Sequence, residues 1–137
     1  MKGSYILLIE LSRDMEIQIG KLGRMEFRKG FYAYVGSAMN NLEKRVERHI
    51  RKEKRLFWHI DYLLENAEVK EVIYTESGKR EECKLAKNLG KYFTSIRNFG
   101  SSDCKCGSHL FFSNNLEDLR SKATMGFKGK ILRKNLL

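Results

Sequence analysis

The alternation of hydrophobic and polar positions in the first forty residues predicts strands. Residues 4–11 are nearly continuous in Tyr, Ile and Leu, which is typical of a buried strand. Residues 16–19 and 24–27 alternate polar with apolar side chains, and glycines mark a turn between them. Residues 31–35 are aromatic and β-favouring. We therefore expect an antiparallel meander in this part of the chain.

The pattern after residue 40 predicts helices. Asn40 or Asn41 is a suitable N-cap for a helix that runs to about Lys54. The elements expected to follow are a helix over roughly residues 56–64, a strand over 69–74, a helix over 80–93 and a strand over 110–112. This order predicts an α+β fold, with a small, mainly antiparallel sheet flanked by helices. Since no linker or repeat interrupts it, residues 1–137 are expected to form one domain.

The chain is strongly basic, with 27 Lys and Arg against 17 Asp and Glu and a formal net charge of +10. A small domain with this charge is expected to bind a polyanion, most commonly nucleic acid, because neutralised phosphates release counterions. No apolar stretch approaches the ~20 residues of a membrane span, and the N-terminus lacks a signal-peptide pattern. The odd number of cysteines, three, argues against a disulfide framework. We expect a cytoplasmic protein that does not bind membranes.

The first predicted helix places Arg45 and His49 one turn apart on the same edge. Its apolar stripe consists of Leu42, Val46 and Ile50. His49 falls within or beside that stripe and Arg45 on its shoulder, whereas Arg48 and Arg51 are expected to point into water. A guanidinium that packing holds in place can bind a phosphate with two parallel hydrogen bonds. The alternative is that Arg45 is a surface charge and His49 a half-buried structural imidazole.

The third predicted helix carries a carboxylate at an unusual position. Projection of this helix places Glu82 near the centre of an apolar arc formed by Leu85, Ala86, Leu89, Tyr92 and Phe93. A carboxylate directed at a core is costly unless it is paired, and Mg²⁺ or Mn²⁺ is a suitable partner for hard oxygen ligands. The alternative is a first-turn glutamate that bends out to solvent and interacts with the helix dipole.

Several aromatic side chains are further candidates. Tyr5 and Tyr34 supply phenols, although core aromatics with a wet hydroxyl are the alternative interpretation. Tyr32 shares a strand face with Tyr34, so alternation does not separate the two. Off the core stripe of the second helix lie Trp58, His59, Asp61 and Tyr62. Aromatics beside basic residues suit stacking on exposed bases, and the alternative is a Trp that half covers the core beside an Asp–basic surface pair.

The three cysteines, together with one histidine, are possible zinc ligands. Cys83, Cys104, Cys106 and His109 together offer a Cys₃His ligand set. The C-x-C-x-x-H spacing is not a common zinc pattern, and Cys83 would have to come close in the fold. The spacing favours buried small thiols and a turn-capping Asp103 instead, so zinc is not the expected cofactor.

Taken in order, these residues resemble the GIY-YIG nuclease superfamily. Its two eponymous tripeptides correspond to Gly3-Ser4-Tyr5 and Tyr34-Val35-Gly36, with Ser4 in place of the usual Ile. Its helix arginine, its His-or-Tyr position and its metal-binding glutamate correspond to Arg45, His49 and Glu82, with one extra residue before Arg45. More closely, the chain is similar to a largely archaeal branch of this superfamily, whose members also occur joined to DNA-repair glycosylases. The supporting segments are residues 30–38, 58–63 and 102–110.

The resemblance implies a GIY-YIG-like domain with an added hairpin near residues 14–30, because the gap between the tripeptides is long. It implies a metal-dependent endonuclease that hydrolyses DNA phosphodiester bonds in repair or recombination, with one Mg²⁺ or Mn²⁺ on Glu82. The expected catalytic residues are Tyr5, Tyr34, Arg45, His49 and Glu82. The residues expected to contact nucleic acid are Lys44, Arg48, Arg51, Trp58 and His59. The alternative function is a non-catalytic nucleic-acid-binding module.

Overall fold

The computed structural model describes residues 1–101, 105–127 and 132–135. Its centre is a six-stranded sheet in the order β6-β7-β4-β1-β5-β8, in which every neighbouring pair is antiparallel. The strands of this sheet are β1 (Gly3–Leu11), β4 (Gly30–Ala38), β5 (Glu68–Glu76), β6 (Thr94–Ser95), β7 (Leu110–Ser113) and β8 (Leu132–Asn135). A separate hairpin consists of β2 (Met15–Gln18), the 3₁₀ turn Gly20–Leu22 and β3 (Arg24–Phe27).

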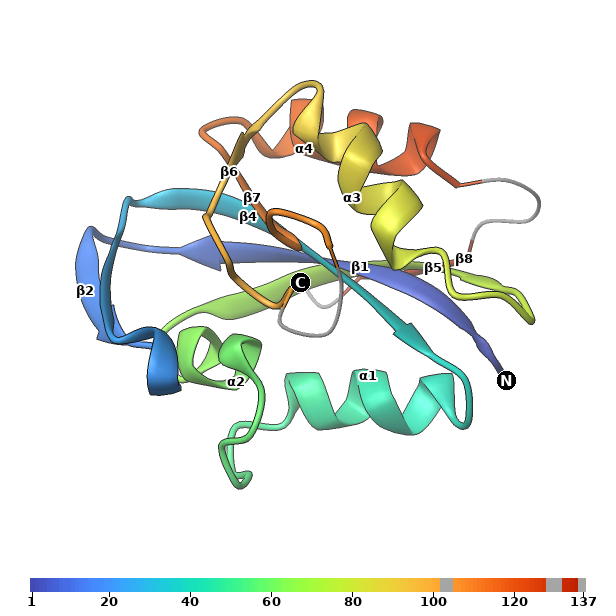
Figure 1. Ribbon diagram of the computed structural model, residues 1–137, viewed down its shortest axis with the longest axis horizontal. Coiled ribbons are helices and arrows are strands. Elements are labelled where there is room, and N and C mark those ends of the chain that lie inside the picture. Colours follow the sequence, from blue (N-terminus) through green and yellow to red (C-terminus); the bar gives the residue numbers. More distant parts are fainter. Residues whose placement is uncertain (102–104, 128–131, 136–137) are drawn as a thin grey trace.

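Helices cover both faces of the sheet (Figure 1). One face is covered by α1 (Leu42–Ile50) and α2 (His59–Leu64), and the other by α3 (Glu82–Gly90) and α4 (Leu116–Met125). The predicted α+β fold, with an antiparallel sheet between helices and an added hairpin, is therefore confirmed. Within the described residues, no helix has the length and apolar character needed to cross a membrane.

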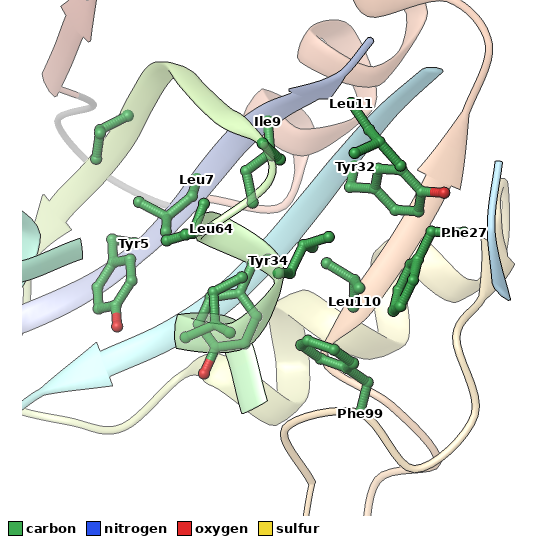
Figure 2. Close-up of a cluster of buried hydrophobic side chains, with 14 of the residues drawn as sticks. Tyr5, Leu7, Ile9, Leu11, Phe27, Tyr32, Tyr34, Leu64, Phe99 and Leu110 are labelled. Carbon is green, nitrogen blue, oxygen red and sulfur yellow. The ribbon is translucent and has the colours of Figure 1, made fainter. Parts of the chain in front are cut away.

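The central strand β1 explains the continuous hydrophobic run near the N-terminus. It pairs with β4 on one side and β5 on the other, and both of its faces are buried. Tyr5 and Leu7 pack into a cluster with α1 and α2, as Figure 2 shows for Leu64 of α2. Ile6 and Leu8 pack into a second cluster with α3 and α4. Because neighbouring side chains of a strand point to opposite faces, one unbroken run supplies both cores.

The fold differs from the sequence prediction in the pairing of the first strands and in one additional helix. The opening strands do not form a meander, since β1 pairs with β4 and the hairpin β2–β3 is inserted between them. The prediction also missed α4, in which only Leu119 and Ala123 are buried, so its apolar pattern is weak. Its start is nevertheless encoded locally, because the side chain of Asn115 accepts a hydrogen bond from the Asp118 backbone N–H.

Three helices are shorter than predicted. α1 ends at Ile50, because Lys54 folds back and donates to the carbonyls of Arg48 and His49. α2 begins only at His59, since the carboxylate of Asp61 accepts hydrogen bonds from the preceding backbone N–H groups at 57 and 58. α3 spans Glu82–Gly90 and not 80–93, with Glu81 as its N-cap residue.

Candidate active site

The cavity that collects the candidate residues lies beside the last residues of β4. The register of β7 with β4 ends at Tyr34 opposite Leu110, and one further backbone hydrogen bond runs from the N–H of Val35 to the carbonyl of His109. The cavity has a volume of about 160 Å³. It is lined by Tyr5, Tyr34, Val35, Gly36, Ser37, Arg45, His49, Trp58, Arg80, Glu82, Gly100 and His109. All five side chains predicted to be catalytic therefore line one cavity.

The glycines of the two tripeptides are required by close packing. Gly36 lies directly opposite Tyr5 in the β1–β4 register, and a Cβ on Gly36 would lie 2.5 Å from Cζ and Oη of the phenol. A Cβ on Gly3 would lie 2.1 Å from the carbonyl oxygen of Thr75 on β5. Any side chain at either position would displace its neighbours. The tripeptides thus fix where the Tyr5 ring lies against β4.

Tyr5 and His49 form a buried hydrogen-bonded pair. Tyr5 Oη lies 2.7 Å from His49 Nε2, and the two side chains are 1% and 2% exposed. Burial raises the pKa of Tyr5 to about 12, against the opposing charge of Arg45. Burial also lowers the pKa of His49 to about 3, and the positive charge of Lys54 adds to this effect. Both groups are therefore neutral near pH 7 in the free protein.

The pKa of His49 predicts a pH dependence of stability. The unfolded chain, with an ordinary pKa of 6.5 for this histidine, binds a proton that the folded state excludes until about pH 3. The stabilisation is present above pH 6.5 and is lost as the pH falls from 6.5 toward 3. This one group is expected to lower the free energy of unfolding by about 2 kcal/mol between pH 7 and pH 5. The measurement is the free energy of unfolding in urea at pH 7 and at pH 5, for wild type and for His49→Gln. The same pH dependence in both proteins would contradict the lowered pKa of His49.

The structure distinguishes Tyr34 from Tyr32, which share a strand face. Figure 2 shows the Tyr34 hydroxyl pointing to the same side of the cluster as that of Tyr5, whereas the Tyr32 hydroxyl points away from both. Tyr32 donates to the carbonyl of Arg28 at 2.6 Å. Tyr34 packs edge-on against His49, with ring centroids 6.0 Å apart, and burial raises the pKa of Tyr34. Only Tyr34 of these two lines the cavity.

Arg45 is held in place by two contacts. Its Nη1 donates to the carbonyl of Ser37 at 3.3 Å, and its Cζ lies 4.5 Å from the centre of the Trp58 ring. A guanidinium over an aromatic ring is attracted to the ring face and loses side-chain freedom. Arg45 is therefore a positioned cation at the cavity wall, and the alternative of a surface charge does not describe it.

Arg48 does not point into water, so its predicted orientation was wrong. It donates two parallel hydrogen bonds of 2.9 Å to the carboxylate of Asp61, which is fully buried, and it lies against the Trp58 ring. Burial by itself raises the pKa of Asp61, but the bonds from Arg48 and from two backbone N–H groups hold it below its ordinary value. The expected Asp–basic pair thus exists, but it joins α1 to α2 inside the protein and not at its surface.

Breaking this pair is expected to destabilise the fold. Asp61→Asn removes the charge that compensates Arg48 while keeping the side-chain shape, and we expect a loss of about 2 kcal/mol in the free energy of unfolding. Asp118→Asn is the control, because Asp118 forms an exposed pair with Lys122 at 3.5 Å, and such pairs contribute little. Equal losses for the two variants in chemical denaturation would contradict this account.

Glu82 is the first residue of α3, and its side chain is directed inward. The side chain is 19% exposed, which excludes a glutamate that bends out to solvent. Its Oε1 lies 3.9 Å from Arg80 Nη1, and its Oε2 is buried with no hydrogen-bond partner among the described residues. A buried carboxylate oxygen without a partner is costly, and a hard divalent cation would satisfy it. A single carboxylate is a hard oxygen ligand of the kind that suits Mg²⁺ or Mn²⁺, which usually keep several waters as their other ligands.

A comparison with protein families matches nearly the whole chain, including the residues that line this cavity. A family model described as "Domain of unknown function DUF123" matches residues 4–131. The chain belongs to the DUF123 family. All of the cavity-lining residues of this DUF123 chain fall within the matched segment. No curated protein and no solved structure matches the chain.

The other residues of the DUF123 chain that were predicted to contact nucleic acid differ from one another in their surroundings. Lys44 and Arg51 are exposed on and just after α1. His59 instead accepts a hydrogen bond at Nδ1 from the backbone N–H of Gly100 at 2.9 Å and packs against Phe99. Trp58 lines the cavity and contacts both arginines of α1. His59 therefore supports the segment that carries Gly100.

Sequence reasoning did not assign Arg80 or His109 to the Glu82 cavity of the DUF123 chain. Arg80 lies beside Glu82, and the basic pair Lys79-Arg80 directly before the two glutamates was a signal for it. His109 was considered only as a zinc ligand, yet it also lines the cavity. Burial lowers the pKa of His109, and the charge of Glu82 opposes this shift. A cation and a buried imidazole therefore accompany the carboxylate.

The structure brings together part of the Cys₃His set that was considered, and not favoured, as a zinc site in the DUF123 chain. The ligand atoms of Cys83, Cys106 and His109 all lie within 4.8 Å of one another. Cys83 is exposed and Cys106 is half-buried. Cys104, and Asp103 as the turn-capping residue, lie outside the described residues. The interpretation of buried thiols was wrong for Cys83, which reaches this cluster from the first turn of α3.

Proposed function

We propose that this DUF123 chain is a metal-dependent endonuclease of the GIY-YIG type that hydrolyses phosphodiester bonds in DNA. One observation carries the proposal: the unpartnered carboxylate oxygen of Glu82 shares a cavity with the guanidinium of Arg45 and the Tyr5–His49 pair, among the residues described. A metal ligand, a fixed cation and a proton acceptor are the parts that phosphodiester hydrolysis requires.

Glu82 is the proposed ligand of one Mg²⁺ or Mn²⁺. Such an ion, when bound, withdraws negative charge from the scissile phosphate. The protein contributes the position of the carboxylate, which the start of α3 fixes at the cavity wall. The guanidinium of Arg80 lies 3.9 Å from the other carboxylate oxygen.

Arg45 is the proposed electrophilic residue. Its guanidinium remains charged at every relevant pH and faces the same cavity as Glu82. The contacts with Ser37 and Trp58 orient it before substrate arrives, so little reorganisation is required when negative charge grows in the transition state.

Tyr5 and His49 act together as the proposed proton acceptor. A phenol with a pKa of about 12 does not ionise near pH 7, so Tyr5 by itself is not a phenolate base. The 2.7 Å contact lets His49 Nε2 accept the phenolic proton while Tyr5 Oη takes a proton from the attacking water. The negative charge of a bound phosphodiester favours the protonated imidazole. Tyr34, whose hydroxyl lies on the same side, orients the water.

DNA is the proposed substrate, in repair or recombination, and the cytoplasm is the proposed location. The net charge of +10 supports a polyanionic partner, and exposed cations such as Lys44 and Arg51 would contact the backbone without reading sequence. Arg48 is a poorer candidate for such a contact, because Asp61 occupies its hydrogen-bonding edge and compensates its charge.

The test is a cleavage assay on branched, flapped and duplex DNA, and on RNA of the same sequence, with EDTA, Mg²⁺ or Mn²⁺. We expect nicking of DNA that requires the metal. Tight, salt-sensitive binding without cleavage in every condition would instead identify the chain as a non-catalytic nucleic-acid-binding module. RNA cleavage in place of DNA cleavage would correct the substrate and keep the mechanism.

A further inference from the structure

We propose that Cys83, Cys106 and His109 bind one zinc ion at a site separate in chemistry from the Glu82 carboxylate. Their ligand atoms lie within 4.8 Å of one another. Ligands that surround zinc tetrahedrally at about 2.0–2.3 Å lie roughly 3.3–3.8 Å apart. The ligand atoms would therefore have to approach one another by about 1 Å to close around zinc.

The backbone already holds the histidine of this cluster in place. The backbone N–H of His109 donates to the carbonyl of Phe99 at 2.8 Å, and its own carbonyl accepts from Val35 of β4 at 3.0 Å. The neighbouring Gly107 accepts from the N–H of Asn98 at 2.8 Å. The segment that carries Cys106 and His109 is thus tied to β4 and to the 98–99 turn before any ion binds. Preorganisation of this kind favours metal binding, because less chain is ordered at the binding step.

The two thiols share a cavity that is also lined by cations. Cys83 and Cys106 line a cavity of about 480 Å³ together with Lys87 and Lys105. Nearby cations stabilise a thiolate, which is the form that coordinates zinc.

The choice of zinc follows from the ligand types. Two sulfur atoms and an imidazole nitrogen are soft or borderline ligands, which select zinc over Mg²⁺ or Mn²⁺. The carboxylate of Glu82 has the opposite preference for hard cations. The two neighbouring sites therefore differ in the class of ion that their ligands prefer.

The zinc ion would join two elements that carry active-site residues. Cys83 directly follows Glu82 in the first turn of α3, and His109 lines the Glu82 cavity. The ion therefore clamps the start of α3 to the segment before β7, and it holds Glu82 at the cavity wall. Cys83 and Cys106 are positioning residues in this account. Zinc binding itself does not depend on the proposed nuclease activity.

The test is the metal content of protein purified without added zinc under reducing conditions. We expect about one zinc per chain, and zinc X-ray absorption is expected to show two sulfur ligands at about 2.3 Å with nitrogen or oxygen at about 2.0–2.1 Å. Cys83→Ser and Cys106→Ser are each expected to lower the zinc content at least tenfold, whereas Glu82→Gln retains zinc. Circular dichroism monitors whether the variants fold.

Three results would overturn the zinc site. The first is wild-type protein that takes up no zinc on reconstitution, and the second is an absorption spectrum without sulfur ligands. The third is an unchanged zinc content in folded Cys83→Ser and Cys106→Ser. The absorption measurement uses wild-type protein only, so it decides the question even if a variant does not fold. A chain that holds zinc but does not cleave DNA would keep this site and reject the proposed nuclease.

Discussion

Glu82→Gln is expected to lower the rate of Mn²⁺-dependent DNA cleavage by about 10³-fold. The substitution keeps the size of the side chain but replaces a charged hard ligand with a neutral amide, so the ion is no longer held beside the phosphate. Loss of one strong electrostatic contribution to the transition state typically costs a factor of this order. The measurement is the single-turnover rate on the best DNA substrate at saturating protein.

The matched control is Glu81→Gln, which makes the same chemical change one residue earlier. Glu81 is the N-cap residue of α3, but its side chain makes no capping hydrogen bond and does not line the cavity. Its substitution is expected to leave the rate within about twofold of wild type, in keeping with the small effect of most surface substitutions. DNA affinity is expected to be unchanged or higher in Glu82→Gln, because a negative charge is removed. Equal cleavage rates for Glu82→Gln and wild type would defeat the metal role of this residue.

Tyr5→Phe is expected to lower the cleavage rate between about 10²- and 10⁴-fold, which is the range for removal of a positioned proton acceptor. The phenyl ring still fits over Gly36, so packing is retained and only the hydroxyl that reaches His49 is lost. The cost in folding is expected to be about 1 kcal/mol, the contribution of one hydrogen bond. Rate–pH profiles of both proteins are the measurement, because loss of the base changes the pH dependence as well as the rate.

Tyr32→Phe is the control for this substitution. Tyr32 is as buried as Tyr5, at 1% exposed, and its hydroxyl also makes one hydrogen bond, but to the carbonyl of Arg28 and away from the cavity. Its loss is expected to reduce stability by a similar amount and to leave catalysis unchanged. If both variants lost activity equally, Tyr5 would have a structural role only.

The sequence predicted best those features that depend on local periodicity. The apolar run of residues 4–11 identified the central strand, because both of its faces are buried. The helical projection correctly placed the side chain of Glu82 on the inward face of α3, although α3 begins at this residue. The tripeptide glycines were found by resemblance alone, and the structure supplies the reason, which is contact with Tyr5 and Thr75.

Features that depend on tertiary partners could not be predicted in this way. Arg48 points inward because Asp61, on the next helix, is buried beneath it, and no helical projection of α1 contains that information. The strand pattern near the N-terminus gave the strands but not their partners, since alternation does not encode which strand pairs with which. The cluster of Cys83 with Cys106 and His109 likewise depends on how α3 packs beside the segment before β7.

The central claim is that Glu82, Arg45 and the Tyr5–His49 pair share one ion-binding cavity. Anomalous diffraction from crystals soaked with Mn²⁺ tests it most directly. We predict one peak inside this cavity, roughly 2.0–2.3 Å from a Glu82 carboxylate oxygen and facing Arg45. A Glu82 side chain engaged by protein donors, with manganese absent from the cavity or bound elsewhere on the chain, would contradict the account.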